Sequence, residues 1–238
     1  MQKNIGPVLF TEVKPPVELN DVVHCYWQIK TESLLESDFT LHAIPDACVN
    51  ILFNQEDTDI AGVTALQTTY TELNLGRGFN YSGIQFFPGA WNGSGDETQD
   101  SFVGTPYNGG LPLVETNRIS APLGLTDKGP VFTDLVLNLL ERGVVERNVV
   151  TQKILANLDS IHNVAEMASI THVSPRQLQR NLKRTTGFSP HDFLKVLRLQ
   201  QTLKQHNLDR YTDQSHFIRS FKKITGYTPT EYFRRYEV

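Results

Sequence analysis

The sequence predicts an α+β protein of two domains, an N-terminal β-barrel or β-sandwich followed by an all-α C-terminal domain. Runs rich in β-branched and aromatic residues, separated by turn formers, fill the chain up to about residue 87. After Gly129-Pro130 the apolar residues recur with a helical period. The 238 residues exceed the roughly 100–150 of a typical single domain, so two domains are expected.

The N-terminal strands are predicted from three short runs, 22–29, 48–53 and 79–87, each bounded by turn-forming residues. Several short strands at this spacing favour a sandwich or a barrel. Glycine, proline and asparagine are frequent in residues 88–130, which predicts loops there.

Two helices are predicted next, one from about residue 131 to Gly143 and one over 149–158. Their apolar stripes could pack on the β domain, join the two domains, or form a dimer seam, and the sequence leaves these alternatives open. We therefore expect a β-rich domain over 1–115, a helical linker and dimerisation segment over 116–158, and a helical domain over 159–238.

The charge is distributed unevenly between the two parts of the chain. Residues 159–238 carry 13 Lys/Arg against 7 Asp/Glu, whereas 1–158 carry 9 against 19, within a total net charge of −4. A basic C-terminal third joined to an acidic remainder is expected when one domain meets phosphate.

Composition also argues against several other classes of protein. Cys25 and Cys48 are the only cysteines, and their spacing fits no zinc pattern, so we expect two reduced core thiols. No apolar run approaches the roughly 20 residues of a membrane span or forms a signal peptide. We expect a cytoplasmic protein without membrane contact.

The start of the basic third predicts a helix-turn-helix. Ser160 is expected to cap a short helix with an apolar side, and the turn 169–173 follows it. Ser174 then caps a second helix with Pro175 at its first position, where a missing N–H costs nothing. Helix, turn and polar second helix is the layout of a DNA-reading unit.

Residues 174–190 and 213–229 are nearly the same sequence twice. Gly187 aligns with Gly226, so that Arg180 falls on Arg219. If the basic face only contacted solvent, there would be no reason for the helix and the glycine turn that ends it to occur twice. Arginine can pair with guanine, glutamine with adenine, and further basic residues with phosphate. The predicted DNA contacts are Arg176, Gln177, Gln179, Arg180, Lys183, Arg184, Gln214, Ser215, His216, Ile218, Arg219, Lys222 and Lys223.

Between the copies, a longer helix is predicted from about Pro190 to Lys204. It would set the distance between the two recognition helices. Helices about one turn of DNA apart, roughly 34 Å, could read adjacent segments of the major groove.

The C-terminal part resembles the AraC/XylS family of transcriptional regulators, most specifically over 213–223 and 225–229. The resemblance implies two helix-turn-helix units on promoter or operator DNA, usually in an activator that works with RNA polymerase. It places Arg176, Gln179 and Arg180 at base-reading positions, and likewise Gln214, Ser215, Ile218 and Arg219. Residues 44–54 and 83–90 resemble the cupin-like β domain of some of these regulators, which binds effectors or mediates dimerisation.

The chain departs from the family between the linking helix and the second recognition helix. Only the eight residues 206–213 lie there, too few for a positioning helix and its turn. Either the sequence omits a stretch after about Leu208, which we favour, or the second unit is incomplete.

An effector site is predicted from Trp27, Arg77 and Phe86. Aromatic residues of a small β domain are usually core, and Arg77 between two glycines is usually a solvated turn. No His-x-His pair with a following Glu is present, so we expect no metal, no cofactor and no catalytic residues.

Three classes of function compete. The leading hypothesis is a sequence-specific transcription regulator that senses a small molecule or a protein through its β domain. An enzyme of the cupin type would need a metal triad or an acid–base pair. A protein-interaction adaptor or anti-activator would keep the fold but have lost productive DNA reading.

Overall fold

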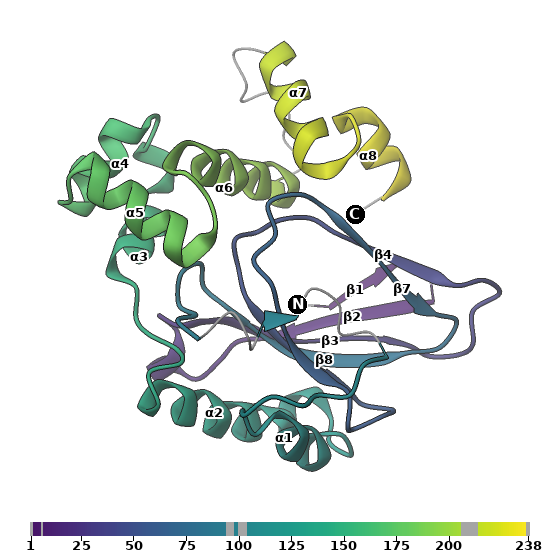
Figure 1. The fold of residues 1–238 in the computed structure, drawn as a ribbon. Helices are drawn as coiled ribbons and strands as arrows, with labels where there is room; N and C mark the ends of the chain where they lie inside the picture. The colour runs from purple at the N-terminus through teal and green to yellow at the C-terminus, as the bar shows by residue number, and fades with distance from the viewer. Residues whose placement is uncertain (1, 6, 94–97, 100–103, 206–213, 237–238) are drawn as a thin grey trace. The chain divides into compact units, whose positions relative to one another are not determined.

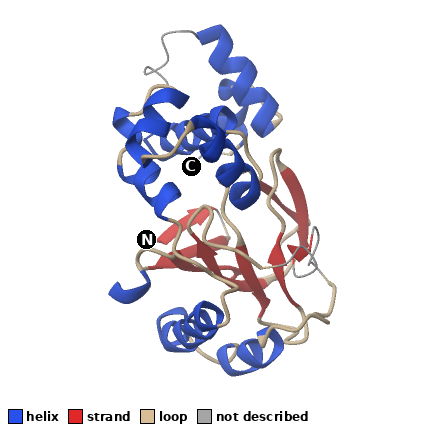
Figure 2. Cartoon of the chain, turned by 60° about the vertical axis from the view of Figure 1, so that its left-hand side comes forward, coloured by secondary structure: helices blue, strands red, loops and turns tan. Residues whose placement is uncertain are grey.

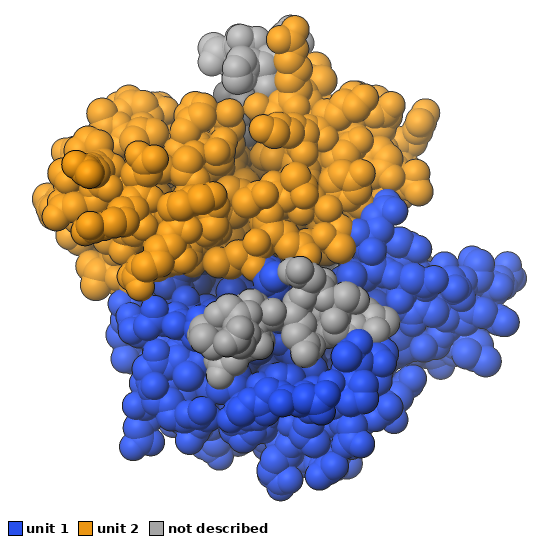
Figure 3. Space-filling model, viewed as in Figure 1, with its two compact units in different colours: residues 1–41, 48–65, 72–147 blue, residues 42–47, 66–71, 148–238 orange. Residues whose placement is uncertain are grey.

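The computed structural model describes residues 2–5, 7–93, 98–99, 104–205 and 214–236, with the backbone alone for 2–5, 98–99, 204–205 and 214–217. The chain divides into two compact units (Figure 3). Unit 1 comprises 1–41, 48–65 and 72–147, and unit 2 comprises 42–47, 66–71 and 148–238. The α+β class is confirmed, with strands in the N-terminal part and α-helices from Leu113 on (Figure 1).

Seven strands form the larger sheet, in the order β1-β2-β3-β8-β5-β6-β9. They are β1 (Gln2–Ile5), β2 (Val8–Val13), β3 (Val23–Thr31), β5 (Asn50–Asn54), β6 (Ala61–Thr64), β8 (Asn80–Phe86) and β9 (Thr98–Gln99). A second sheet pairs β4 (Phe39–Ala43) with β7 (Thr71–Gly76). The three predicted runs correspond to β3, β5 and β8, and β8 pairs with both of the others in antiparallel register.

An apolar cluster joins the two sheets of this β-rich region. Val8, Ile29 and Tyr81 come from the larger sheet, and Leu75 comes from β7, with Leu41 and Leu73 packed against them. Among the described strands the order is linear and does not close, so the sandwich-like alternative fits and a closed barrel does not.

Two helices of unit 1, α1 (Leu113–Ser120) and α2 (Leu125–Glu141), lie against the larger sheet (Figure 2). Phe132 of α2 stacks on Phe53, with ring centroids 5.2 Å apart, and meets Tyr26 edge-on at 5.5 Å. Burial raises the pKa of Tyr26 to about 12, although its hydrogen bond with Thr133 acts in the opposite direction. The apolar stripe of α2 therefore packs on the sheet.

The expectation of loops through residues 88–130 is wrong for α1 and for the first turns of α2. The buried side of α1 includes the polar residues Thr116, Asn117 and Ser120, so apolar periodicity does not reveal it. Helix α2 begins at Leu125 and contains Pro130, although an interior proline removes a helical hydrogen bond and usually ends a helix.

A buried polar network joins α1 and α2 to the connection between β5 and β6. The amide of Asn117 donates to the backbone carbonyls of Asn54, Thr58 and Ile60 at 2.9, 3.1 and 3.2 Å. Gln55 donates to Asn117 at 2.8 Å and accepts from Lys128 Nζ at 2.6 Å. Lys128 is fully buried and also donates to the carbonyl of Ser120, the last residue of α1. Burial lowers the pKa of Lys128 to about 8.

Unit 2 contains the remaining α-helices. They are α3 (Val149–Ala156), α4 (Val164–Thr171), α5 (Pro175–Thr186), α6 (Pro190–Gln205), α7 (Gln214–Thr225) and α8 (Pro229–Arg235). Ile154 of α3 is buried in the same cluster as Met167, Leu178, Leu182 and Phe193. The stripe of α3 thus belongs to the helical core of unit 2.

Candidate nucleic-acid interface

Helices α4 and α5 form the predicted helix-turn-helix. Asn163 caps α4 by accepting a hydrogen bond from the Glu166 N–H at 3.0 Å. Ser160 instead ends the 3₁₀ turn Leu158–Ser160, so its prediction as the cap is wrong. His172 ends α4 in the left-handed region, at φ 58°, and Ser174 caps α5 as predicted. The connection between the two helices is therefore a three-residue turn.

Helix α5 has one buried face and one basic exposed face. Leu178 and Leu182 are completely buried, and Thr185 and Thr186 lie beside them. The exposed residues include Arg176, Gln179, Arg180, Lys183 and Arg184. These five are among the predicted DNA contacts, and the structure leaves them at the surface of unit 2.

Two of the predicted contacts in α5 also hold the ends of the helix. The side-chain oxygen of Gln177 accepts from the Ser174 N–H at 3.0 Å, which completes a capping box. Lys183 Nζ donates to the carbonyl of Gly187 at 2.8 Å. The capping bond accounts for Gln177 without any base contact.

Helix α7 repeats this arrangement over the residues whose side chains are described. Phe221 and Thr225 are buried, whereas Ile218, Arg219, Lys222 and Lys223 are exposed. The predicted contacts Gln214, Ser215 and His216 lie in the first turn of α7, where the structure describes the backbone alone.

The repeat extends to the hydrogen bonds that end each helix. Thr186 donates to the Leu182 carbonyl at 2.7 Å and accepts from the Phe188 N–H at 3.4 Å. Thr225 donates to the Phe221 carbonyl at 2.9 Å and accepts from the Tyr227 N–H at 3.3 Å. In both copies the next residue is a left-handed glycine, with φ 75° at Gly187 and 82° at Gly226.

The helices that follow are capped alike as well. The Ser189 hydroxyl accepts from the Asp192 N–H at 3.2 Å, and the Thr228 hydroxyl accepts from the Glu231 N–H at 3.4 Å. In return the Thr228 N–H donates to the Glu231 carboxylate, which lowers the pKa of that group. The hydroxyl residue and the proline occur in both copies because each copy of the repeat ends one helix and starts the next.

Thr186→Val is expected to lower the free energy of unfolding by about 1–3 kcal/mol, because the buried Phe188 N–H loses its acceptor. Urea denaturation of the full chain measures this. Thr186→Ser, which retains the hydroxyl, is the control. An unchanged midpoint in the valine variant would show that the repeated threonine has no capping role.

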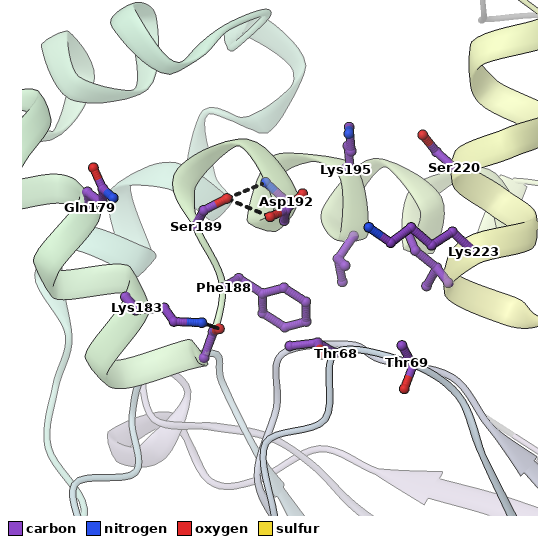
Figure 4. A pocket seen from close by; sticks show the side chains of 13 residues that line it. Thr68, Thr69, Gln179, Lys183, Phe188, Ser189, Asp192, Lys195, Ser220 and Lys223 are labelled. Atoms are coloured by element: carbon purple, nitrogen blue, oxygen red, sulfur yellow. Dashed lines mark hydrogen bonds between the residues drawn. The ribbon is translucent and has the colours of Figure 1, made fainter.

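A groove of about 410 Å³ lies between α5 and α7 in unit 2 (Figure 4). Three lysines line it, Lys183 from α5, Lys195 from α6 and Lys223 from α7. Hydroxyl groups are added by Ser189, Ser220, Thr68 and Thr69. Among the described residues that line it, Asp192 is the one carboxylate, and it accepts from the Ser189 hydroxyl at 2.7 Å. Such a lining suits a phosphate group.

The groove includes residues that the sequence did not indicate. Lys195 lies on the helix that was expected only to set the distance between the two recognition helices, and Thr68 and Thr69 come from the N-terminal half of the chain. Only the folded chain brings these positions together, and no local pattern marks them.

The three predicted effector residues lie in separate sets of contacts. Trp27 packs over Gly83, where a Cβ atom would come within 2.6 Å of the indole, and its Nε1 donates to Asn50 at 3.2 Å. Phe86 is fully buried beside Trp91, with ring centroids 5.7 Å apart. Arg77 is exposed and donates to the Leu35 carbonyl at 2.7 Å.

Within the described part of the chain, no group of three or more His, Cys, Asp and Glu residues is placed to hold a metal ion. Nor does any described helix have the length and apolar character needed to cross a membrane.

Two family models match the chain. Residues 11–102 match a domain of unknown function, DUF6597, over most of the β-rich region. Residues 210–234 match the model of bacterial regulatory helix-turn-helix proteins of the AraC family, a segment that contains all of α7 and most of α8. Comparisons with curated proteins and with solved structures gave no match.

Proposed function

We propose that this chain, an AraC-family DNA-binding transcription regulator with a β-rich N-terminal domain, activates transcription from promoters that it reads with α5 and α7. The observation that carries the proposal is the repeat itself: two exposed basic helices end in the same threonine–glycine turn with the same hydrogen bonds. Arg180 and Arg219 occupy equivalent positions on these helices and are proposed to read bases.

The lysines between the helices are proposed to hold the DNA backbone. Lys183, Lys195 and Lys223 line one groove, and the duplex backbone passes between two adjacent major-groove segments. Phosphate contacts set the register of a protein on DNA, whereas base contacts provide the specificity.

The N-terminal β-rich domain is proposed to control this activity by binding a small molecule or a protein. We further propose the domain limits 1–115, 116–158 and 159–238, homodimerisation, contact with RNA polymerase, and a cytoplasmic location, where the DNA is. Trp27, Arg77 and Phe86 are proposed to contribute to the effector site.

Affinity for duplex DNA is expected to fall steeply with salt, with a slope of log K against log salt of about −0.9 for each phosphate neutralised. Lys223→Gln should make that slope shallower by about 1 and weaken binding to all sequences alike. Titrations at several salt concentrations measure both effects. Lys14→Gln, which removes an exposed charge from unit 1, is the control and should leave the slope unchanged.

The alternative function is that of an adaptor or anti-activator. It is favoured by one observation, the short interval of eight residues between α6 and α7. An adaptor would show little affinity for DNA at any salt concentration, so the same titration separates the two functions.

A further inference from the structure

Among the described residues, no helix and turn precede the second recognition helix as they precede the first. Helix α5 is preceded by α4 and a turn, which together occupy 164–174. The 238-residue sequence is continuous between Gln205 and Gln214, so the expectation of an omitted stretch is wrong. The eight residues 206–213 lie outside the described residues, and they are too few for a helix and turn of that size.

Residues from the N-terminal half bind the carboxyl end of α7. Helix ends leave carbonyl groups without partners inside the helix. The carbonyl of Ile224 accepts from the Tyr70 N–H at 3.1 Å, and the carbonyl of Thr225 lies 2.8 Å from His42 Nε2. Because a carbonyl can only accept, Nε2 carries the hydrogen in this contact. Both segments that supply these donors, 42–47 and 66–71, belong to unit 2.

The His42 ring is enclosed by tyrosines. It is only 9 % exposed, and its centroid lies 4.9 Å from Tyr70, 5.3 Å from Tyr227, 6.0 Å from Tyr232 and 4.9 Å from Tyr236. Three of these tyrosines follow α7 in the chain. The ring is therefore fixed against α8 while its nitrogen holds the end of α7.

The rest of segment 42–47 packs against the same helices. Ile44 contacts the apolar cluster formed by Leu199 of α6, Phe221 of α7 and Tyr232 of α8. Gln200 of α6 donates to the Pro45 carbonyl at 2.9 Å. One short segment thus contacts all three helices of the second half of unit 2.

We propose that segments 42–47 and 66–71 do for α7 what α4 does for α5, and that His42 is a positioning residue for the second recognition helix. The consequence for DNA rests on the proposed function: reading by α7 depends on His42 and Tyr70, which donate to the carbonyls at its end, whereas the described hydrogen bonds at the end of α5 come from Thr186 and Lys183. A change at the ends of β4 or β7, in which His42 and Thr71 lie, would then act selectively on one of the two DNA segments.

The test compares full-length wild type with His42→Ala, His42→Gln and the control His191→Ala, which alters an exposed histidine of α6. Amide hydrogen exchange is measured over α5 and over 218–225 of α7. In His42→Ala, exchange in α7 is expected to rise at least tenfold while α5 stays within twofold of wild type. His42→Gln, whose amide nitrogen can take the place of Nε2, should stay closer to wild type than His42→Ala.

Unchanged α7 exchange in His42→Ala, or equal loosening of α5 and α7, would overturn the inference. Should His42→Ala fail to fold, His42→Asn, whose amide is one methylene shorter than that of His42→Gln, replaces it in the same comparison. Footprinting on a DNA site bound by wild type tests the effect on DNA reading. In His42→Ala, protection should be lost only over the segment contacted by α7. If wild type binds no specific DNA, the proposed function fails, and the exchange measurement still decides the role of His42.

Discussion

Arg180→Ala is expected to lower the affinity of the full-length protein for its specific site about 10- to 100-fold, roughly 1–3 kcal/mol. Arg180 is exposed on α5, and Leu178 and Leu182 hold the opposite face in the core. If the guanidinium forms two hydrogen bonds with a guanine, truncation to alanine removes both of them. The loss should be larger on the specific site than on unrelated DNA.

Arg142→Ala is the matched control, because it removes the same charge from the exposed end of α2 in unit 1. Affinities for the specific and the unrelated duplex, measured at one salt concentration, give the comparison. Equal loss on both duplexes in Arg180→Ala would show that this side chain contributes charge without reading bases.

Lys128→Met is expected to lower the free energy of unfolding by roughly 2–4 kcal/mol at neutral pH. The methionine keeps the length of the side chain but leaves Gln55 Oε1 and the Ser120 carbonyl without their buried donor. Urea denaturation measures the loss, and Lys14→Met, at an exposed position, serves as the control. A variant as stable as wild type would mean that the network contributes nothing net to stability.

The same lysine predicts a pH dependence. Its pKa is about 8 in the folded chain against 10.5 ordinarily, so between these values the unfolded chain binds the proton and the folded chain does not. The free energy of unfolding should therefore rise with pH across this window in wild type, relative to Lys128→Met. Taking the difference between the two proteins removes the contribution of Tyr26, whose raised pKa acts in the opposite direction above pH 10. A flat difference would contradict the burial of a titrating ammonium.

Local patterns predicted the parts of the fold that depend on local chemistry. Strands β3, β5 and β8 follow from runs of β-branched and aromatic residues, and α5 from its serine cap, its proline and its apolar spacing. The repeated turn was predictable because threonine, glycine, hydroxyl and proline each have a fixed task at the end of one helix and the start of the next.

The sequence could not indicate contacts that polar residues make across long separations. Helix α1 faces the sheet with Asn117, whose partner Asn54 is 63 positions away, and apolar periodicity cannot report such a contact. The contact between His42 and Thr225 spans 183 positions and gave no local signal at all. For the same reason Thr68, Thr69 and Lys195 were absent from the predicted site.

Capture of genomic DNA fragments by full-length wild type, beside an Arg180→Ala, Arg219→Ala double variant, tests the central claim most directly. Wild type should recover fragments that share a sequence motif, and the double variant should lose that motif. Equal and motif-free recovery by both proteins would leave only charge-driven binding and would contradict sequence-specific reading by α5 and α7.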